Sequence, residues 1–196
     1  PASFVSYGML PLPEGSGVRG RKPGTGLLVP AGFARGGEVE PFAQEQVRED
    51  TSCSWYEDGE GPLHPREGRT RPYASGEDGT CYSWAKAPRY GGRPAETGPL
   101  AEMVMAGHPL FREAVRSLGS TLFTRQLARI ARGAELLPAL EGWLAELTPD
   151  QPFYRPPGEI VSGRGFGLTQ AARGALGHWV AIEEGRIERY QVITPT

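Results

Sequence analysis

The longest hydrophobic pattern lies in the middle of the chain and predicts a helix. Apolar side chains recur there at steps of three and four, a spacing that places them on one face of an α-helix. They are Leu122, Phe123, Leu127, Ile130, Ala134, Leu137, Leu140, Trp143, Leu144 and Leu147. Ser120 or Thr121 can cap this helix, and Pro138 predicts either a kink or two helices that meet near 135–138. The stripe could form a groove for a partner, but packing in the core is the favoured interpretation.

Two shorter helices are expected before it. Pro99 opens a segment that runs through Met105, and Pro109 opens another that runs through Leu118. Proline suits the first turn of a helix because the amide hydrogen that it lacks would have no intrahelical partner there. The central part of the chain, from about 99 to 147, is therefore predicted to be helical.

Shorter patterns in the first half predict strands and turns. Brief apolar segments at 4–7, 27–29 and 38–40 are separated by glycine-rich stretches. Residues 57–80 form a long segment rich in glycine, proline and charge. Because a compact domain rarely keeps so long a loop, we expect this segment to cover a neighbouring element or to pack on a partner.

The end of the chain predicts a β-hairpin. β-Branched residues are concentrated in 179–182 and 187–193, and the Glu-Gly dipeptide at 184–185 is typical of a two-residue turn. Counting outward from this turn places Arg173 opposite Thr196, a register that one bulge would shift. A guanidinium and a hydroxyl would then meet at the open end of the hairpin, where they would suit an anionic or strongly polar group. Bonding of Arg173 to nearby carbonyl groups is the simpler alternative.

Composition favours a single α+β unit and argues against several kinds of partner. A chain of 196 residues is long enough to bury its own core. The net charge of −2 gives no case for nucleic acid or an anionic membrane, and no apolar run reaches the length of a membrane span. We divide the chain into a strand- and loop-rich part (1–98), a helical part (99–150) and a loop followed by the hairpin (151–196). Its two ends suggest a fragment of a longer chain.

The sequence contains no complete motif for a metal or a phosphate group. Cys53 and Cys81 are far apart, and we interpret them as lone thiols, buried or half-buried, although a disulfide between them stays open. The three histidines are scattered, so no metal ligands are assigned within the chain. The glycines of 163–167 lack the spacing of a nucleotide-binding loop and are better explained by close approach of the backbone to another element.

Residues 82–101 combine aromatic, basic and rigid residues. Lys86 or Glu96 taken alone would be expected in a surface ion pair worth at most about 1 kcal/mol. The density of aromatic residues around them is equally consistent with an ordered interface.

Four blocks together carry a resemblance to a known family. They are Tyr82–Tyr90 (YSWAKAPRY), Glu96–Ala101 (ETGPLA), Ala171–Trp179 (AARGALGHW) and Tyr190–Thr196 (YQVITPT). In this order and at these separations the chain resembles the large subunit of nickel–iron hydrogenases across about residues 50–196. The resemblance implies that the chain is part of a larger, mostly helical fold with small β-elements.

The resemblance also implies a function. It implies a nickel–iron centre with cyanide and carbonyl ligands, heterolytic cleavage of H2, and pairing with an iron–sulfur small subunit. It makes Arg173 the catalytic outer-shell residue, which bonds one cyanide and is a candidate proton relay, and Thr196 the donor to the second cyanide. Ala172 and Pro195 would lie beside the centre. The implied location is periplasmic, or membrane-associated through the small subunit, and a cytoplasmic location stays open.

The chain departs from the family pattern at several positions. Gln170 stands where the family usually has glutamate, Ala172 where it has proline, and Glu102 where it commonly has arginine. Neither Cys53 nor Cys81 matches the four cysteines that hold the metals in the family, so those ligands would lie outside this chain. Two alternatives therefore stay open: a metal-free homologue with a structural or electron-coupling role, and a paralogue that senses H2.

Overall fold

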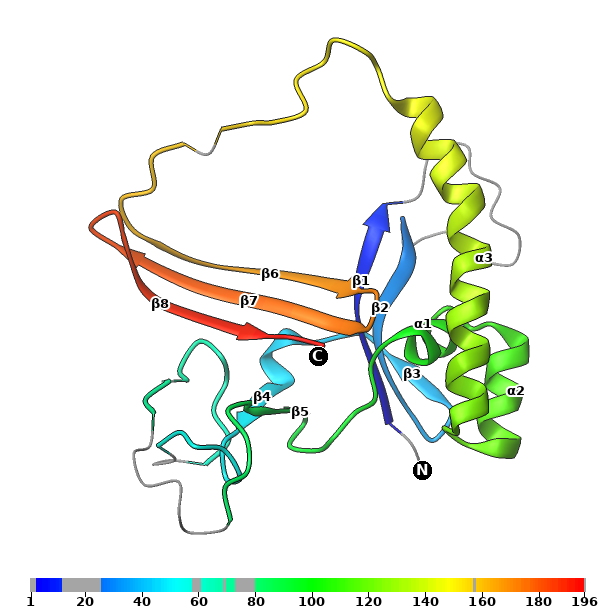
Figure 1. The fold of residues 1–196 in the computed structure, drawn as a ribbon, viewed down its shortest axis with the longest axis horizontal. Coiled ribbons are helices and arrows are strands. Elements are labelled where there is room, and N and C mark those ends of the chain that lie inside the picture. The colour runs from blue at the N-terminus through cyan, green and yellow to red at the C-terminus, as the bar shows by residue number, and fades with distance from the viewer. Residues whose placement is uncertain are drawn as a thin grey trace.

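The computed structural model describes residues 3–11, 26–57, 61–68, 70–72, 80–156 and 158–195. Within them the chain has the predicted α+β organisation, with small antiparallel sheets and a helical segment (Figure 1). The strands are β1 (Ser3–Pro11), β2 (Leu27–Arg35), β3 (Glu38–Glu40), β4 (Val47–Asp50), β5 (Ala87–Tyr90), β6 (Gly163–Ala171), β7 (Gly174–Glu183) and β8 (Arg186–Ile193). The helices are α1 (Pro99–Met105), α2 (Pro109–Leu118) and α3 (Leu122–Glu146), with a 3-10 turn at Gln44–Gln46.

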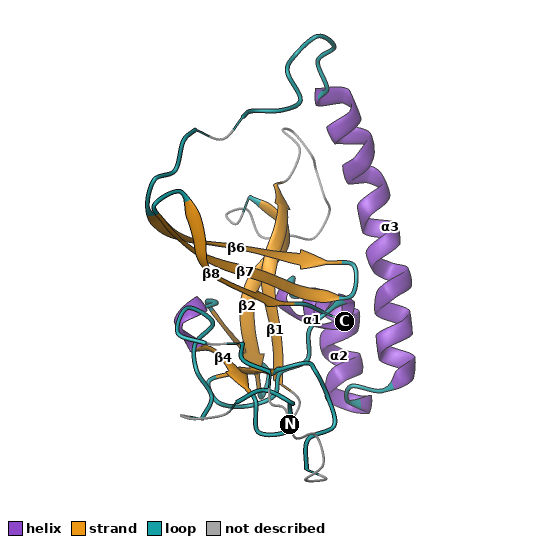
Figure 2. Ribbon diagram, turned by 60° about the vertical axis from the view of Figure 1, so that its left-hand side comes forward, coloured by secondary structure: helices purple, strands orange, loops and turns teal. Residues whose placement is uncertain are grey.

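The sheet of β1, β2 and β3 forms the middle layer of the molecule. Alternate residues of β1 face opposite sides, because successive side chains of a strand point in opposite directions. Phe4 joins a core cluster with α1, α2 and α3, whereas Val5 and Tyr7 join a second cluster with Trp179 and Ile193. Figure 2 shows the result: the sheet of β6, β7 and β8 crosses β1 and β2 on the side away from the helices.

The three helices have the predicted boundaries. Thr121 caps α3, because its hydroxyl accepts from the amide of Thr124 while the Thr124 hydroxyl accepts from the amide of Thr121. Pro138 lies inside one continuous helix, so the alternative of two separate helices is wrong. Among the described residues no helix combines the length and apolar composition that a membrane-spanning segment needs.

The predicted burial of the α3 stripe is mostly wrong. The side of α3 that packs inward carries Thr124, Ala128, Arg132 and Ala139, and small residues such as Ala128 allow α1 to approach closely. Larger apolar residues of the stripe remain exposed, namely Leu122, Phe123, Ile130, Leu137, Leu140, Leu144 and Leu147. The periodicity identified the helix correctly, but not the side that faces the core of this chain.

The C-terminal hairpin belongs to a three-stranded sheet. The two-residue turn at 184–185 is confirmed, with positive φ at both Glu184 (49°) and Gly185 (72°). The additional strand β6 pairs with β7 over its whole length. The prediction of a loop in this region is therefore wrong. The close approach of its three glycines to another element is also wrong, since a Cβ on Gly163, Gly165 or Gly167 would have no atom within 4 Å. They also leave part of the outer face of the sheet without side chains.

The inner face of this sheet is covered by the 3-10 turn at Gln44–Gln46 and by the long loop after β4. Trp179 is 1% exposed and donates from its indole nitrogen to the side-chain oxygen of Gln44. Gln191 receives a hydrogen bond from Lys86 and donates to the carbonyl of Gly68. Gly177 leaves room for the indole, since a Cβ there would lie 2.5 Å from the Trp179 ring. The described parts of 57–80 thus cover a neighbouring element, as predicted.

Both cysteines are free thiols. Cys81 is half-buried as expected, but Cys53 is exposed, because it lies in a turn at the surface rather than in either core cluster.

Candidate functional site at the β6–β7 turn

Ala172 and Arg173 form the two-residue turn that joins β6 to β7. The last pair of the ladder is Ala171 with Gly174, and both turn residues are exposed. Among the residues that the structure describes, none forms a hydrogen bond or an ion pair with the Arg173 guanidinium. The alternative in which Arg173 bonds nearby carbonyls therefore finds no support in this part of the chain.

The base of the turn is held by the loop before α1. The Thr97 hydroxyl accepts from the backbone amide of Ala175 at 2.8 Å and from the side-chain amide of Gln170 at 3.0 Å. The other end of the Gln170 amide accepts from the backbone amide of Tyr7 at 3.1 Å. Gln170 is fully buried, so both of its polar ends are bonded within the protein.

Two glycines let the backbones approach each other at this point. Gly174 has a φ of 146°, and a Cβ on it would lie 2.5 Å from the methyl carbon of Thr97. A Cβ on Gly98 would lie 2.9 Å from the carbonyl oxygen of Arg173. Larger residues at either position would push the turn away from the start of α1.

A buried ion pair attaches the same turn to the helices. Arg132 on α3 places its Nε 2.8 Å from a carboxylate oxygen of Glu102 on α1, and the two side chains are 10% and 2% exposed. Arg132 also donates to the carbonyl of Ala171 at 3.3 Å and contacts the sulfur of Met9 at 3.1 Å. Glu102, noted above as a departure from the family pattern, thus has a structural partner in Arg132.

The predicted register opposite Arg173 is wrong. Ile182 pairs with Ile187 as expected, but a bulge follows and Ala181 pairs with Arg189. The extra residue shifts all later pairs by one, so that Gly177 faces Ile193 and the position opposite Arg173 is not that of Thr196.

The end of β8 nevertheless lies at the same end of the sheet as the β6–β7 turn (Figure 1). Pro195 is half-buried there, and Ala172 is exposed. Thr196 lies outside the described residues, so its predicted role stays a prediction.

The block around Lys86 differs from the surface interpretation. Lys86 is 9% exposed, lies 3.4 Å from Glu49 and donates to Gln191 at 2.8 Å. Burial raises the pKa of the Glu49 carboxyl, and the nearby Lys86 ammonium opposes that rise. Glu96 accepts two hydrogen bonds from the Arg125 guanidinium, at 2.8 and 2.9 Å. Lys86 is therefore part of the buried support of the sheet.

No set of metal ligands is present among the described residues, since no three His, Cys, Asp or Glu side chains gather at one point there. The groups at the β6–β7 turn fit a different task. A guanidinium is a strong donor that keeps its charge, and here it extends from a fixed backbone. This part of the chain could thus donate hydrogen bonds to a polar group that other residues hold.

The sequence indicated Arg173 but not its supports. Thr97 and Arg132 were not recognised, although Arg132 lies four residues after Ala128 and eight after Thr124. That spacing of small or polar residues was an available sign of the buried side of α3.

Comparison with known proteins places the whole chain in one family. A family model described as nickel-dependent hydrogenase matches residues 2–196. The chain is 31% identical to an uptake hydrogenase large subunit from Rhodobacter capsulatus, over 99% of this chain and 39% of that protein. It is also 31% identical to a periplasmic [NiFeSe] hydrogenase large subunit from Desulfomicrobium baculatum, over 87% of this chain and 36% of that protein.

The fold agrees with this relationship. The reduced Ni-Fe-Se hydrogenase from D. vulgaris Hildenborough matches with a TM-score of 0.80 and 29% identity, over 98% of this chain and 42% of that one. The chain thus spans about two fifths of the length of these relatives. By sequence and by fold, this chain belongs to the nickel-dependent hydrogenase family.

Proposed function

We propose that this chain supplies the outer-shell donors of a nickel–iron hydrogenase large subunit that interconverts H2 with protons and electrons. The observation that carries the proposal is the β6–β7 turn, where the Arg173 guanidinium has no described partner while the backbone on both sides of it is bonded. The nickel–iron centre, when bound, would supply the chemistry of heterolytic H2 cleavage. Its cysteine ligands would come from residues outside this chain.

The proposed task of Arg173 is to donate hydrogen bonds to a cyanide ligand of the iron. A nitrogen acceptor in a dry pocket needs a strong donor, because an unpaired polar group there would cost about 1 to 3 kcal/mol or more. Thr196 is proposed as the donor to the second cyanide, with Ala172 and Pro195 beside the centre. Since an arginine side chain loses its proton very reluctantly, holding the acceptor is a better supported role for Arg173 than carrying protons.

The proposed partner is an iron–sulfur small subunit. The relatives are named as large subunits or large chains, and one of them as quinone-reactive. Tyr82 and Trp84, which are 76% and 55% exposed, offer aromatic surface of the kind enriched in protein interfaces. A periplasmic location, or attachment to a membrane through the small subunit, is also part of the proposal, and the relatives named as periplasmic and as quinone-reactive support it.

The test is Arg173→Lys in the full-length enzyme. Lysine keeps the positive charge but loses the planar fork, so we expect turnover of H2 to fall about 10- to 100-fold while nickel content is retained. Arg186→Lys is the matched control, because Arg186 is an exposed arginine at the opposite end of the same sheet. Wild-type turnover in Arg173→Lys would contradict the proposed role.

A metal-free homologue is the second candidate, and one observation favours it. Gln170 occupies the position of the usual glutamate and both ends of its amide are bonded, so this position offers no carboxylate for proton transfer. Nickel analysis of the intact protein separates the candidates, since a scaffold would contain none. A sensing paralogue would retain nickel but turn over H2 far more slowly than an enzyme.

A further inference from the structure

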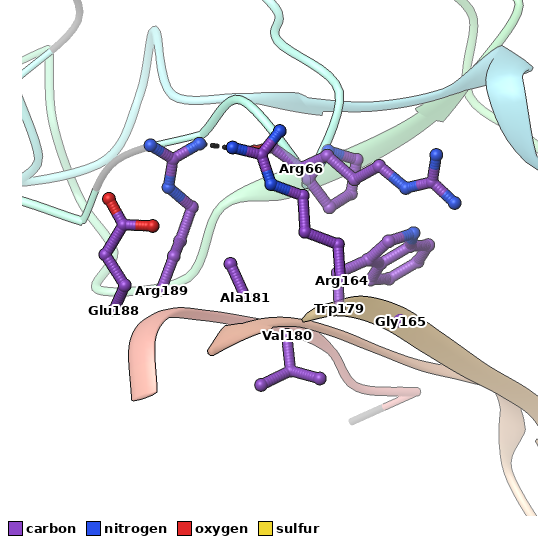
Figure 3. Close-up of a pocket in the computed structure, with 9 residues that line it drawn as sticks. Arg66, Arg164, Gly165, Trp179, Val180, Ala181, Glu188 and Arg189 are labelled. Atoms are coloured by element: carbon purple, nitrogen blue, oxygen red, sulfur yellow. Dashed lines mark hydrogen bonds between the residues drawn. The ribbon is translucent and has the colours of Figure 1, made fainter. Parts of the chain in front are cut away.

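Two arginine side chains point toward each other on one face of the β6–β7–β8 sheet (Figure 3). Arg164 on β6 and Arg189 on β8 each pair with Ala181 on the central strand. Neighbouring strands lie about 4.8 Å apart, so the two arginines start about 10 Å apart. Because Ala181 is small, both long side chains can reach over it. The sheet thus gathers two positive charges above a single methyl group.

The bulge in β8 creates this arrangement. Ile182 pairs with Ile187 and Ala181 with Arg189, which leaves Glu188 as the extra residue. A regular ladder would have paired Ala181 with Glu188, and Arg164 would then have faced a carboxylate across the central strand. The bulge replaces this favourable arrangement of opposite charges by a pair of arginines.

A loop fixed on the sheet encloses one side of the space between the arginines. Arg189 donates to the backbone carbonyl of Arg66, and the Arg66 guanidinium lies 4.9 Å from the centre of the Phe166 ring. The buried indole of Trp179 lines the same pocket. The pocket has a volume of about 20 Å³, which is enough for one water-sized group. One oxygen atom of a ligand could therefore enter it, while the other atoms of that ligand would lie at its mouth.

The pocket has an excess of positive charge. Its lining includes three arginines, Arg66, Arg164 and Arg189, against one carboxylate, Glu188. In the part of the chain that the structure describes, no carboxylate lies within ion-pair distance of Arg164 or Arg189. Guanidinium groups bind oxyanions well because their parallel N–H groups match two oxygens at once.

We propose that this pocket binds a doubly charged tetrahedral oxyanion of the phosphate or sulfate class. A dianion matches the excess of two positive charges better than a carboxylate would. One oxygen would enter the space above Ala181, and the others would accept from Arg164 and Arg189. Arg66 holds Arg189 through its carbonyl and adds positive charge at the edge of the pocket. This site is separate from the β6–β7 turn and does not depend on hydrogenase activity.

The test is a calorimetric titration of the full-length protein, with its partner chain where it has one. Inorganic phosphate is the probe, and chloride keeps the ionic strength constant because surface charge effects depend on salt. We expect saturable binding with one phosphate per chain, competition by sulfate, and none by chloride. Arg164→Gln should weaken binding about tenfold or more, since it removes charge-assisted hydrogen bonds. Arg164→Gln combined with Arg189→Gln should abolish it.

Two further variants serve as controls. Glu188→Gln should tighten binding several-fold, because it removes the negative charge at the pocket. Arg186→Gln should leave binding unchanged, since Arg186 lies on β8 like Arg189 but does not line the pocket. The Arg164 side chain forms no hydrogen bond or ion pair with the described residues, so its substitution should leave the fold intact. Absence of saturable binding, equal binding by the double variant, or equal competition by chloride would each overturn the proposal.

Discussion

The two ends of the β6–β7–β8 sheet carry arginines in opposite ways. At the β6–β7 turn a single exposed guanidinium extends from a backbone that is held by the half-buried Thr97 and the buried Gln170 and Arg132. At the bulge end, Arg164 and Arg189 converge on a shallow pocket, and one hydrogen bond to the Arg66 loop provides the local support.

The difference shows what each end is built to control. The groups that support the turn are uncharged or, like Arg132 beside Glu102, paired with an opposite charge. They therefore hold the backbone of the turn in place without adding net charge to it. The bulge end concentrates unbalanced positive charge, with Arg164 exposed and Arg189 half-buried. Substitutions near the turn should therefore disturb geometry and stability, whereas substitutions near the bulge should disturb charge.

The largest effect should come from breaking the ion pair that supports the turn. In the full-length protein, Arg132→Leu removes the positive charge beside the buried Glu102 carboxylate, which should destabilise the fold by about 3 to 5 kcal/mol. The carbonyl of Ala171 also loses a donor, so amide hydrogen exchange should accelerate in β6 and β7. Thermal unfolding and exchange monitored by mass spectrometry measure the two effects.

A double substitution separates the charge from the geometry. Glu102→Met with Arg132→Leu removes both charges, so much of the stability should return while exchange at the turn stays fast. Arg129→Leu is the matched control, because Arg129 is exposed on the same helix. Equal stability of Arg132→Leu and Arg129→Leu would show that the pair does not support the turn.

A smaller effect is expected at Thr97. Thr97→Val keeps the shape of the side chain but removes the oxygen that accepts from Gln170 and Ala175. Leaving these donors without an acceptor should cost about 1 to 3 kcal/mol in thermal unfolding. Thr148→Val, at an exposed threonine beyond α3, should change little. If the two valine variants melt alike, the hydroxyl of Thr97 is not a support of the turn.

The helical part was predictable because its signals are local. Pro99 and Pro109 begin α1 and α2, and Thr121 caps α3, so each boundary is specified within a few residues of itself. The turn at 184–185 was predictable for the same reason, since its dipeptide suits two positive φ angles. The position of Arg173 at an end of the sheet followed in part from these elements and in part from the family resemblance.

The predictions that were wrong all concern features that depend on contacts between residues far apart in the sequence. The glycines of β6 made its sequence unlike that of a strand, but pairing with β7 stabilises it as one. One bulged residue, Glu188, shifted the register that would have paired Arg173 with Thr196. The side of α3 that faces the core is set by α1, and there a small residue, Ala128, packs more closely than a leucine could. Strand formation, register and the buried side of a helix are here determined by packing, and the propensities of neighbouring residues in the sequence do not specify them.

The smallest expected effect lies at the bulge end and depends on pH. His64 accepts from the amide of Arg66 through Nδ1, so its proton must be on Nε2, which faces Gln44. Burial lowers the pKa of the His64 imidazole below its usual value of about 6.5. Protonation would direct a second N–H at the amide of Arg66 and release the loop beside the arginine pocket. The neutral ring therefore stabilises the protein above about pH 6.5, and this contribution is lost as the pH falls through the lowered pKa.

His64→Asn provides the comparison, because the asparagine oxygen can accept from the amide of Arg66 but does not titrate. Between pH 7.5 and pH 5, wild type should lose stability relative to His64→Asn. The total loss should be about 1.4 kcal/mol for each unit by which the pKa of His64 in the folded state lies below its pKa in the unfolded state. Urea unfolding of both proteins at each pH measures the difference, and the carboxyl groups common to both cancel. Amide exchange should accelerate at Arg66 and remain unchanged at Ala175, because the β6–β7 turn is held by groups that do not include His64. A stability difference that stays constant across this range would show that the loop beside the arginines is not controlled by His64.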